Sequence, residues 1–386
     1  MNNNVLIIIP ERKGTIAGVA FNMYKAISQS PNTTVWVADL GNTGESFPFD
    51  NVFTIKPSHI PLLGRVITAI RRINLLKSVK CNKHIDISIS SSEGCNFWNA
   101  ITKKKDKCIG IFHVRIEQNQ KMGLLVYSGV KFSKKYIYTR LDRIFAVNKS
   151  AQISWQTNLP TKKVELVYNI HLFDRIIQLS KSVIPAEDMA IFKDPVLLFV
   201  GHLYKIKGPD RLIKAFAHVH KSFPELKLVF IGTGFDTISE DEIKELIASE
   251  AISESVRFLG FKDNPYPYLK YSTMLVSPSR EEGLPGVLIE ALSLGTKVVA
   301  TNSSIGVWEI MGCDEDYDAN LTSMYETEFG VITNNCGDED SIVKSLADGI
   351  CKCYSNNYRV SSFDKEKFSK ERFLNKLYEG FDYSAN

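Results

Sequence analysis

The sequence lacks any apolar run of the ~18 to 20 residues that a membrane-spanning helix needs, although 44% of its 386 residues are hydrophobic. It also lacks a basic leader with a small-residue cleavage site, because the chain enters the strand-like VLIII at residues 5–9 almost at once. The seven cysteines are odd in number and show no Cys-x-x-Cys spacing. We therefore expect a protein that is neither integral nor secreted, with free thiols in a reducing cytosol.

There is also little excess charge of either sign. The net charge of +4 argues against a dedicated nucleic-acid binder. The small total hides an asymmetry, since residues 1–175 hold 25 Lys and Arg against 11 Asp and Glu, and the remainder holds 22 against 32. The two parts, with net charges of +14 and −10, are expected to face different partners or surroundings.

Short β-branched and apolar runs alternate with helical stretches along most of the chain, which is typical of parallel sheets covered on both faces. The pattern appears first at 5–9, 34–40, 85–90, 108–114 and 143–147. It restarts at 196–201, 226–232, 256–260, 274–277, 297–301 and 330–333. The fold class predicted is α/β, with two Rossmann-like doubly wound units in tandem.

Length supports two domains as well. We place the first at residues 1–175 and the second at 195–362, joined by a linker at 176–194 that contains Pro185 and lacks strand periodicity. Aromatic residues at helical spacing predict a C-terminal helix within 363–386, which could pack back on the first domain. A ligand is expected in a cleft between the two domains, over the carboxyl ends of both sheets.

The most informative segment is SPSREEGLPGVLIEALSL at residues 277–294. A strand ends in a polar turn, and Gly283, Pro285 and Gly286 then open a helix whose free amides can bind an anion such as a diphosphate. Glu282 lies in the turn and Glu290 lies two helical turns further on, where the two carboxylates can bind a sugar and a ribose. In the alternative interpretation Glu282 caps the helix and Glu290 is solvated.

Three segments together resemble the retaining glycosyltransferases of family 4, which have the two-domain GT-B fold and a Glu-x7-Glu motif. EGLPGVLIEAL at 282–292 matches the family's local form, GFKDNPYPYLK at 260–270 looks like its NPYxY segment, and VVATNSSIGVWEI at 298–310 is similar to a downstream motif. The resemblance is strong over about residues 195–350 and weak in the first half. It implies that Glu290 binds the ribose and that Glu282 holds the sugar hydroxyls.

A further match is GHLYKIKGPDRLIKAF at 201–216, where the family has an Arg and a Lys that contact the donor diphosphate. Lys207 stands at the expected lysine, but His202 replaces the arginine. Histidine is largely neutral at pH 7 and cannot form a bidentate fork, so we expect a weaker or pH-dependent phosphate site. The resemblance also implies that the helix start, Gly283, Leu284, Pro285, Gly286 and Val287, binds the donor.

Other candidates rest on position in the family pattern. Gly232 and Gly234 lie in a loop near the nucleotide, although a lone GxG is a weak signal and a plain turn is an equal alternative. The backbone near Lys262 and Asn264 is where the family reads its base.

In the first half, Gly14 fits loosely a glycine-rich loop that approaches the donor. His113 ends a strand where the family has a histidine beside the sugar, and a purely structural histidine is the alternative.

Basic residues of the first half cluster beside apolar ones. Residues 61–80 are predicted to form an amphipathic helix with five cations, Arg65, Arg71, Arg72, Lys77 and Lys80. Residues 103–107 and 131–135 add further positive charge. Such segments suit adsorption to an anionic membrane surface, although each could also be the solvated face of an ordinary helix.

The predicted activity is a retaining hexosyltransferase that moves a sugar from a UDP-hexose or UDP-N-acetylhexosamine donor to a saccharide acceptor. Its catalytic residues would be Glu282, Lys207 and His113. The acceptor is expected to be lipid-linked, in cell-surface polysaccharide biosynthesis at the cytoplasmic face of the membrane. We expect no metal and no cofactor, because no Asp-x-Asp lies in a plausible site. A nucleotide-sugar 2-epimerase and a non-catalytic UDP-sugar-binding protein remain alternatives.

Overall fold

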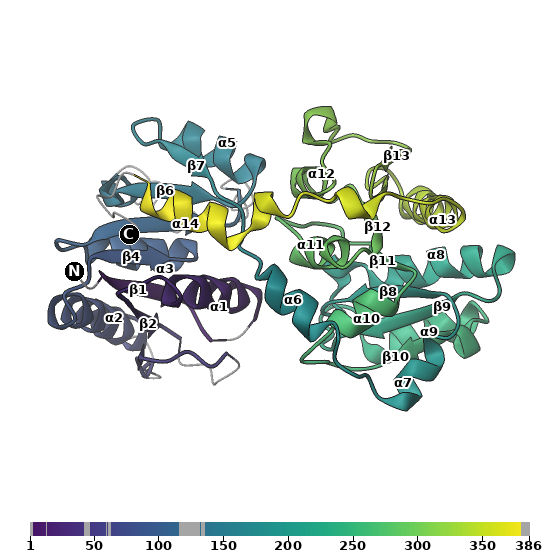
Figure 1. Cartoon of the computed structure of the whole chain (residues 1–386), viewed down its shortest axis with the longest axis horizontal. Coiled ribbons are helices and arrows are strands. Elements are labelled where there is room, and N and C mark those ends of the chain that lie inside the picture. The colour runs from purple at the N-terminus through teal and green to yellow at the C-terminus, as the bar shows by residue number, and fades with distance from the viewer. Residues whose placement is uncertain are drawn as a thin grey trace. The chain divides into compact units, whose positions relative to one another are not determined.

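The computed structural model describes residues 3–12, 14–41, 47–58, 60, 63–115, 132 and 136–379. The chain divides into two compact units (Figure 1). Unit 1 is made of residues 1–172 and 366–386, and unit 2 is made of residues 173–365. Each unit is an α/β sandwich around a mainly parallel sheet, as the alternating sequence pattern predicts.

Among the described residues, seven strands form the sheet of unit 1 in the order β3-β2-β1-β4-β5-β6-β7, with every neighbouring pair parallel. The strands are β1 (Asn3–Ile9), β2 (Thr33–Asp39), β3 (Val52–Thr54), β4 (Ile87–Ser90), β5 (Lys107–Phe112), β6 (Arg143–Ala146) and β7 (Val164–Leu166). The helices are α1 (Gly14–Ser28), α2 (Gly64–Asn82), α3 (Glu93–Ile101), α5 (Lys149–Asn158) and α14 (Lys370–Tyr378).

The strand β1 shows why residues 5–9 are continuously apolar. Val5, Ile7 and Ile9 pack into a core with residues of α1 and α14. Leu6 and Ile8 point to the opposite face, where they pack with residues of α2 and α3. Because both faces of this run are buried, no position within residues 5–9 is left for a polar side chain.

All residues of unit 2 are described, and seven strands form its sheet in the order β10-β9-β8-β11-β12-β14-β13, in which only β13 is antiparallel. The strands are β8 (Val196–Val200), β9 (Lys227–Ile231), β10 (Val256–Phe258), β11 (Met274–Ser277), β12 (Lys297–Thr301), β13 (Met324–Thr327) and β14 (Gly330–Thr333). The helices are α6 (Phe173–Leu179), α7 (Ala186–Ile191), α8 (Pro209–Ser222), α9 (Glu240–Ser249), α10 (Tyr266–Tyr271), α11 (Gly286–Ser293), α12 (Ile305–Ile310) and α13 (Glu339–Ser355).

The segment 176–194, expected to be a linker, belongs to unit 2 instead. It contains α7 and the end of α6, and Asp188 of α7 anchors it. The Asp188 carboxylate is 2.8 Å from Lys262 Nζ and accepts a hydrogen bond of 2.6 Å from the Tyr268 hydroxyl. These contacts between residues distant in sequence explain why the absence of strand periodicity did not mean a free linker.

The C-terminal helix α14, yellow in Figure 1, returns to unit 1. Its residues Phe373 and Leu377 are buried in the same core as α1. The Arg143 guanidinium donates to the carbonyls of Lys376 and Glu379 at the end of this helix, at 2.5 and 3.1 Å, and so satisfies acceptors that the helix itself leaves unpaired. Phe381, part of the aromatic pattern in the sequence, lies outside the described residues.

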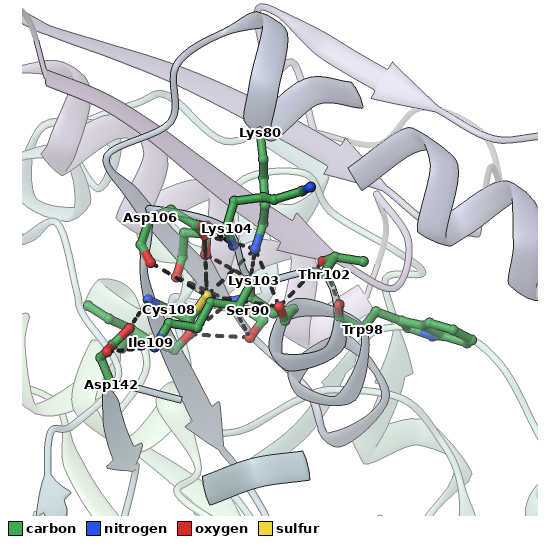
Figure 2. Close-up of polar contacts among 12 residues, drawn as sticks. Lys80, Ser90, Trp98, Thr102, Lys103, Lys104, Asp106, Cys108, Ile109 and Asp142 are labelled. Carbon is green, nitrogen blue, oxygen red and sulfur yellow. Dashed lines mark hydrogen bonds and ion pairs between the residues drawn. The ribbon is translucent and has the colours of Figure 1, made fainter. Parts of the chain in front are cut away.

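A buried ion pair connects α2 to the sheet of unit 1 (Figure 2). Lys80 Nζ is 2.8 Å from the Asp106 carboxylate, and neither side chain is accessible to solvent. Lys80 also donates to the Asn99 side chain at 2.7 Å, and Ser88 donates to Asp106 at 2.6 Å. Although burial raises the pKa of Asp106, its ion pair and hydrogen bonds outweigh burial, and the pKa is lower than usual. The expected place of Lys80 among the membrane-facing cations is therefore wrong.

Removing the charge of Lys80 is expected to destabilise unit 1. Lys80→Met leaves the Asp106 carboxylate buried without its cation, and the loss of one partner of a buried pair costs about 3–5 kcal/mol. The measurement is urea unfolding followed by tryptophan fluorescence, since three of the four tryptophans lie in unit 1. Lys77→Met, at an exposed position of the same helix, is the matched control and should change stability by about 0.5 kcal/mol or less. Equal effects of the two substitutions would contradict this interpretation.

Candidate functional site

The loops that carry most of the predicted site residues leave one edge of the sheet in unit 2. The strand β8 pairs in parallel with β9 on one side and with β11 on the other, and β11 pairs in parallel with β12. The carboxyl ends of these four strands therefore lie at the same edge. The chain order reverses at β8, and ligands of doubly wound sheets bind outside such a reversal point.

Lys207 and Glu282 meet at this edge although they are 75 residues apart. Lys207 ends a short 3-10 turn (Lys205–Lys207) after β8, and Glu282 lies in the loop after β11. Lys207 Nζ is 2.6 Å from Glu282 Oε1, which also accepts a hydrogen bond of 2.8 Å from the Ser279 hydroxyl. Both charged side chains keep some access to solvent, so a ligand can reach them.

Glu282 does not cap the helix that follows it. Pro285 occupies the position before α11, and in this fully described part of the chain no side chain caps the helix. The carbonyl of Gly283 accepts a hydrogen bond of 3.1 Å from the Ser304 hydroxyl, which fixes the turn from the opposite side. The alternative in which Glu282 is a capping residue is therefore wrong, and the first amides of α11 stay available for a ligand.

Glu290 is not a solvated surface residue either. It lies in α11 and is half-buried, and burial raises the pKa of its carboxyl to about 7. A hydrogen bond from the Tyr266 hydroxyl opposes this rise by favouring the carboxylate. Burial, followed by the nearby Glu290 charge, raises the pKa of Tyr266 above its usual value, so this hydroxyl stays a donor. The carboxyl of Glu290 is thus poised to change its charge near neutral pH.

His202 follows β8 and is exposed. Its Nδ1 lies 3.1 Å from the carbonyl oxygen of Thr233, and its ring stacks on Tyr204 with centroids 4.8 Å apart and an interplanar angle of 8°. Gly232, at φ +141°, makes this approach of the loops after β8 and β9 possible, because a Cβ there would lie 1.8 Å from the carbonyl oxygen of Gly201. Gly234 lies in the same loop, next to the two rings.

The side chains of Lys262 and Asn264 bind the segment that precedes β8. Lys262 pairs with Asp188 of α7, and Asn264 donates a hydrogen bond of 2.9 Å to the carbonyl of Leu179 at the end of α6. These side chains anchor the segment, which leaves only the backbone at these two positions for a nucleotide base.

Two predicted residues lie in unit 1, and both follow parallel strands. Gly14 begins α1 after β1 with φ +81°, and His113 follows β5. The His113 Nε2 is 3.0 Å from the Ser91 hydroxyl, which follows β4. Burial lowers the pKa of His113 to about 4, so the ring is neutral at physiological pH. A neutral ring can hydrogen-bond a sugar hydroxyl without adding charge.

The other basic segments of the first half differ in availability. Lys103 is paired with Asp142 at 2.7 Å. Arg72 donates to the carbonyl of Leu40 and lies over the ring of Trp98. The lysines of the segment 131–135 lie outside the described residues. Free positive charge on the described part of unit 1 is therefore less than the count of basic residues predicts.

Sequence reasoning did not identify two charged residues beside the Lys207–Glu282 pair. Arg280 lies two residues before Glu282, and Asp210 lies in the first turn of α8. They form a two-pronged ion pair with both N–O distances at 2.9 Å. The sequence signal was that Arg280 falls inside the segment 277–294, just before the Glu-x7-Glu motif, whereas Asp210 looked like an ordinary acidic residue at a helix start.

Two features are absent from the described residues. Within those ranges, no group of three or more His, Cys, Asp or Glu side chains is arranged to hold a metal ion. In the same part of the chain, no helix is both long enough and apolar enough to cross a bilayer.

Comparison with known proteins gives the following similarities. A sequence model of the family described as glycosyl transferases group 1 matches residues 186–317. An N-acetylgalactosamine-N,N'-diacetylbacillosaminyl-diphospho-undecaprenol 4-alpha-N-acetylgalactosaminyltransferase of Campylobacter jejuni is 31% identical over 250 residues, covering 62% of this chain and 61% of that protein. The amylovoran biosynthesis glycosyltransferase AmsD of Erwinia amylovora is 25% identical over 284 residues, covering 72% and 76%. The chain spans between 47% and 64% of the length of three of its curated relatives.

Among solved structures, the Anabaena protein HepE in complex with UDP and glucose superposes with a TM-score of 0.70 at 14% identity, covering 98% of this chain and 99% of that one. Two Rossmann-like units and this similarity define the GT-B fold, so the fold class expected from the sequence is confirmed. The match of the group 1 glycosyl transferase model lies within unit 2 and confirms the family resemblance of the sequence motifs.

The raised pKa of Glu290 predicts a pH-dependent stability. The carboxyl binds its proton more tightly in the folded state, with a pKa of about 7, than in the unfolded chain, with a pKa near 4.5. Stability from this group is therefore greatest at low pH and is lost as the pH rises from about 4.5 to about 7. We expect the unfolding free energy of the wild type minus that of Glu290→Gln to fall over this range and to level off above it. A pH-independent difference, measured by urea unfolding, would contradict the assignment.

Proposed function

We propose that this chain is a retaining glycosyltransferase that transfers a hexosyl or N-acetylhexosaminyl group from a UDP-sugar. The observation that carries the proposal is the Lys207–Glu282 contact of 2.6 Å at the carboxyl edge of the sheet in unit 2. A cation and a carboxylate side by side suit a donor with a charged diphosphate next to a neutral sugar. Glu290, eight residues after Glu282, suits the ribose hydroxyls.

In this mechanism the bond between the anomeric carbon and the diphosphate breaks, and negative charge builds on the departing phosphate. Lys207 and the first amides of α11 stabilise that charge, which is the electrostatic logic of an oxyanion hole. The acceptor oxygen forms the new bond on the same face of the sugar. The proton of the acceptor hydroxyl passes to the departing phosphate oxygen. Because the new bond forms on the face that the diphosphate leaves, the configuration of the donor is kept. This mechanism requires no metal.

The remaining predicted residues have supporting roles. His202 Nδ1 bonds the carbonyl of Thr233, which leaves Nε2 as the ring atom proposed to contact a phosphate. The backbone of Gly232, Gly234, Lys262 and Asn264 is proposed to contact the nucleotide. From unit 1, we propose that Gly14 and His113 contact the substrates.

The choice of UDP and of a lipid-linked acceptor is supported by similar proteins. The HepE structure with a TM-score of 0.70 holds UDP and glucose. The name of the Campylobacter relative gives it a diphospho-undecaprenol-linked saccharide as acceptor, and the Erwinia relative acts in amylovoran biosynthesis. We therefore propose a lipid-linked saccharide acceptor in cell-surface polysaccharide synthesis.

The test measures turnover of a panel of UDP- and GDP-sugars with lipid-linked saccharide acceptors. Turnover is monitored as release of the nucleotide. Glu282→Gln and Lys207→Ala are each expected to lower kcat by roughly 10²-fold or more, since each removes a group that acts on the developing charges or the sugar. Glu281→Gln, at the exposed neighbouring position, is the matched control and should keep the wild-type rate. Chelation of divalent metals should leave the rate unchanged.

Other outcomes would indicate a different function, a different mechanism or a different site. An epimerised sugar released without acceptor would indicate a nucleotide-sugar 2-epimerase, and UDP binding without turnover would indicate a binding protein. A product whose anomeric proton shows inverted configuration by NMR would overturn the retaining mechanism. An unchanged rate in Glu282→Gln would overturn the assignment of the catalytic site.

We also propose that unit 1 adsorbs to an anionic membrane surface through α2. Leu63, Val66 and Ile70 lie three and four residues apart, so they share one helix face, and each exposes more than half of its surface. Arg65 and Arg71 are exposed on the same helix, and Arg71 also donates a hydrogen bond of 2.7 Å to the carbonyl of Lys56. Exposed apolar residues between cations suit the interface of an anionic bilayer.

Vesicle co-sedimentation tests this surface. Arg65→Gln with Arg71→Gln is expected to weaken binding to vesicles containing phosphatidylglycerol by about tenfold or more, since each cation contributes roughly 1 kcal/mol. Val66→Ser with Ile70→Ser should weaken binding further, because it removes the inserted apolar side chains. Ile153→Ser, at an exposed apolar position of α5, is the control. Equal binding to neutral phosphatidylcholine vesicles would contradict the electrostatic part.

A further inference from the structure

Arg280 links the two loops that carry Lys207 and Glu282. Its backbone N–H donates to the carbonyl of Ile206 at 2.7 Å, and its guanidinium Nη1 donates to the carbonyl of Lys205 at 2.6 Å. Both acceptors belong to the short turn that ends at Lys207. Arg280 itself lies two residues before Glu282. One residue of the second loop therefore holds the backbone of the first loop at two points.

Asp210 also holds the guanidinium of Arg280. Nη1 and Nη2 donate to the two carboxylate oxygens at 2.9 Å each, and Lys205 Nζ lies 2.6 Å from the same carboxylate. Burial raises the pKa of Asp210, but the bonds from Arg280 and Lys205 outweigh it, and the net pKa is lower than usual. A bidentate pair that is only slightly exposed fixes both distance and orientation.

The backbones of the two loops also touch. Gly208, which directly follows Lys207, has φ +72°, and a Cβ at this position would lie 2.2 Å from the carbonyl oxygen of Pro278. The turn after β8 can therefore move relative to the loop after β11 only by a separation of the two. The polar contacts of Arg280 oppose such a separation.

Arg280 is not a substitute for the arginine that His202 replaces. Its Nη2 also donates to Glu339 at the start of α13, at 3.2 Å, in addition to Asp210. Its Nη1 is shared between Asp210 and the carbonyl of Lys205. Both terminal nitrogens of the guanidinium thus have protein acceptors, so a donor phosphate would have to displace them.

We propose that Arg280 is a positioning residue, which sets the geometry of the Lys207–Glu282 pair through its contacts with Asp210 and with the carbonyls of Lys205 and Ile206. This inference rests on the proposed transferase function for its kinetic consequence. Its structural consequence is independent of that function. A displacement of about 1 Å at a reacting centre can cost about 10²-fold in rate, so these contacts matter although Arg280 touches no substrate.

Kinetics of the full chain with the accepted UDP-sugar separate positioning from direct contact. Arg280→Ala and Asp210→Ala should each lower kcat/KM by about 10- to 100-fold, and the double variant should be no worse than the more severe single one. Arg280→Lys should recover only part of the loss, because an ammonium keeps the charge but not the fork. Loss in Arg280→Ala with wild-type kinetics in Asp210→Ala would overturn the proposal, since Arg280 would then act on the donor itself.

Lys297→Ala is the matched control. Lys297 caps the carbonyls of Cys353 and Asn356 from the start of β12, at the other end of the strand from the site. The Lys297→Ala substitution should lower the melting temperature of unit 2 and leave kcat/KM unchanged. If the Arg280 and Asp210 variants behave in the same way, their role is only structural and the proposal fails.

Crystal structures of the wild type and Arg280→Ala test the same geometry without a donor. We expect the 2.6 Å contact between Lys207 Nζ and Glu282 Oε1 to be lost in the variant. Retention of this contact would overturn the proposal. A wild type that consumes no nucleotide sugar would refute the proposed function alone, and the structural comparison would still decide the role of Arg280.

Discussion

The candidate site depends on the parallel pairing of β8 with its two neighbours, β9 and β11. Parallel strands all end at the same edge of a sheet, so the turns that follow them are brought together whatever their separation in the sequence. This is how Lys207 and Glu282, 75 residues apart, come within 2.6 Å. An antiparallel β11 would place the loop that carries Glu282 at the opposite edge, and an antiparallel β9 would do the same to the loop that carries Gly232.

The charges at this edge occur in compensated pairs. Lys207 is paired with Glu282, and Arg280 with Asp210, in a unit whose overall charge is acidic. An unpaired ammonium or carboxylate that is partly buried would be costly, whereas a pair can exchange one partner for a ligand. A diphosphate that binds Lys207 would release Glu282 to accept from a sugar hydroxyl. The resting ion pair and the proposed bound state thus use the same two side chains.

In unit 1, several basic residues stabilise the fold and are not available on the surface. A count of lysines and arginines made residues 61–80 look uniformly basic, but Lys80 is buried against Asp106 and Arg72 is held by the carbonyl of Leu40. Their charges stabilise the attachment of α2 to the sheet. The exposed face keeps Arg65 and Arg71 beside Val66 and Ile70, a smaller patch than the sequence predicted.

The sequence by itself determined the fold class and most strands, because strands buried on both faces need continuous apolar runs. It did not reveal β3, β7 and β13, which are short strands at sheet edges and have few buried positions. The local motif around Glu282 and Glu290 was readable because its residues are contiguous. Tertiary structure decided the contacts of Arg280, the partial burial of Glu290, the burial of Lys80 and the attachment of residues 176–194 to unit 2. Each depends on a partner distant in sequence or on enclosure by other elements, and neither leaves a periodic signal in the chain.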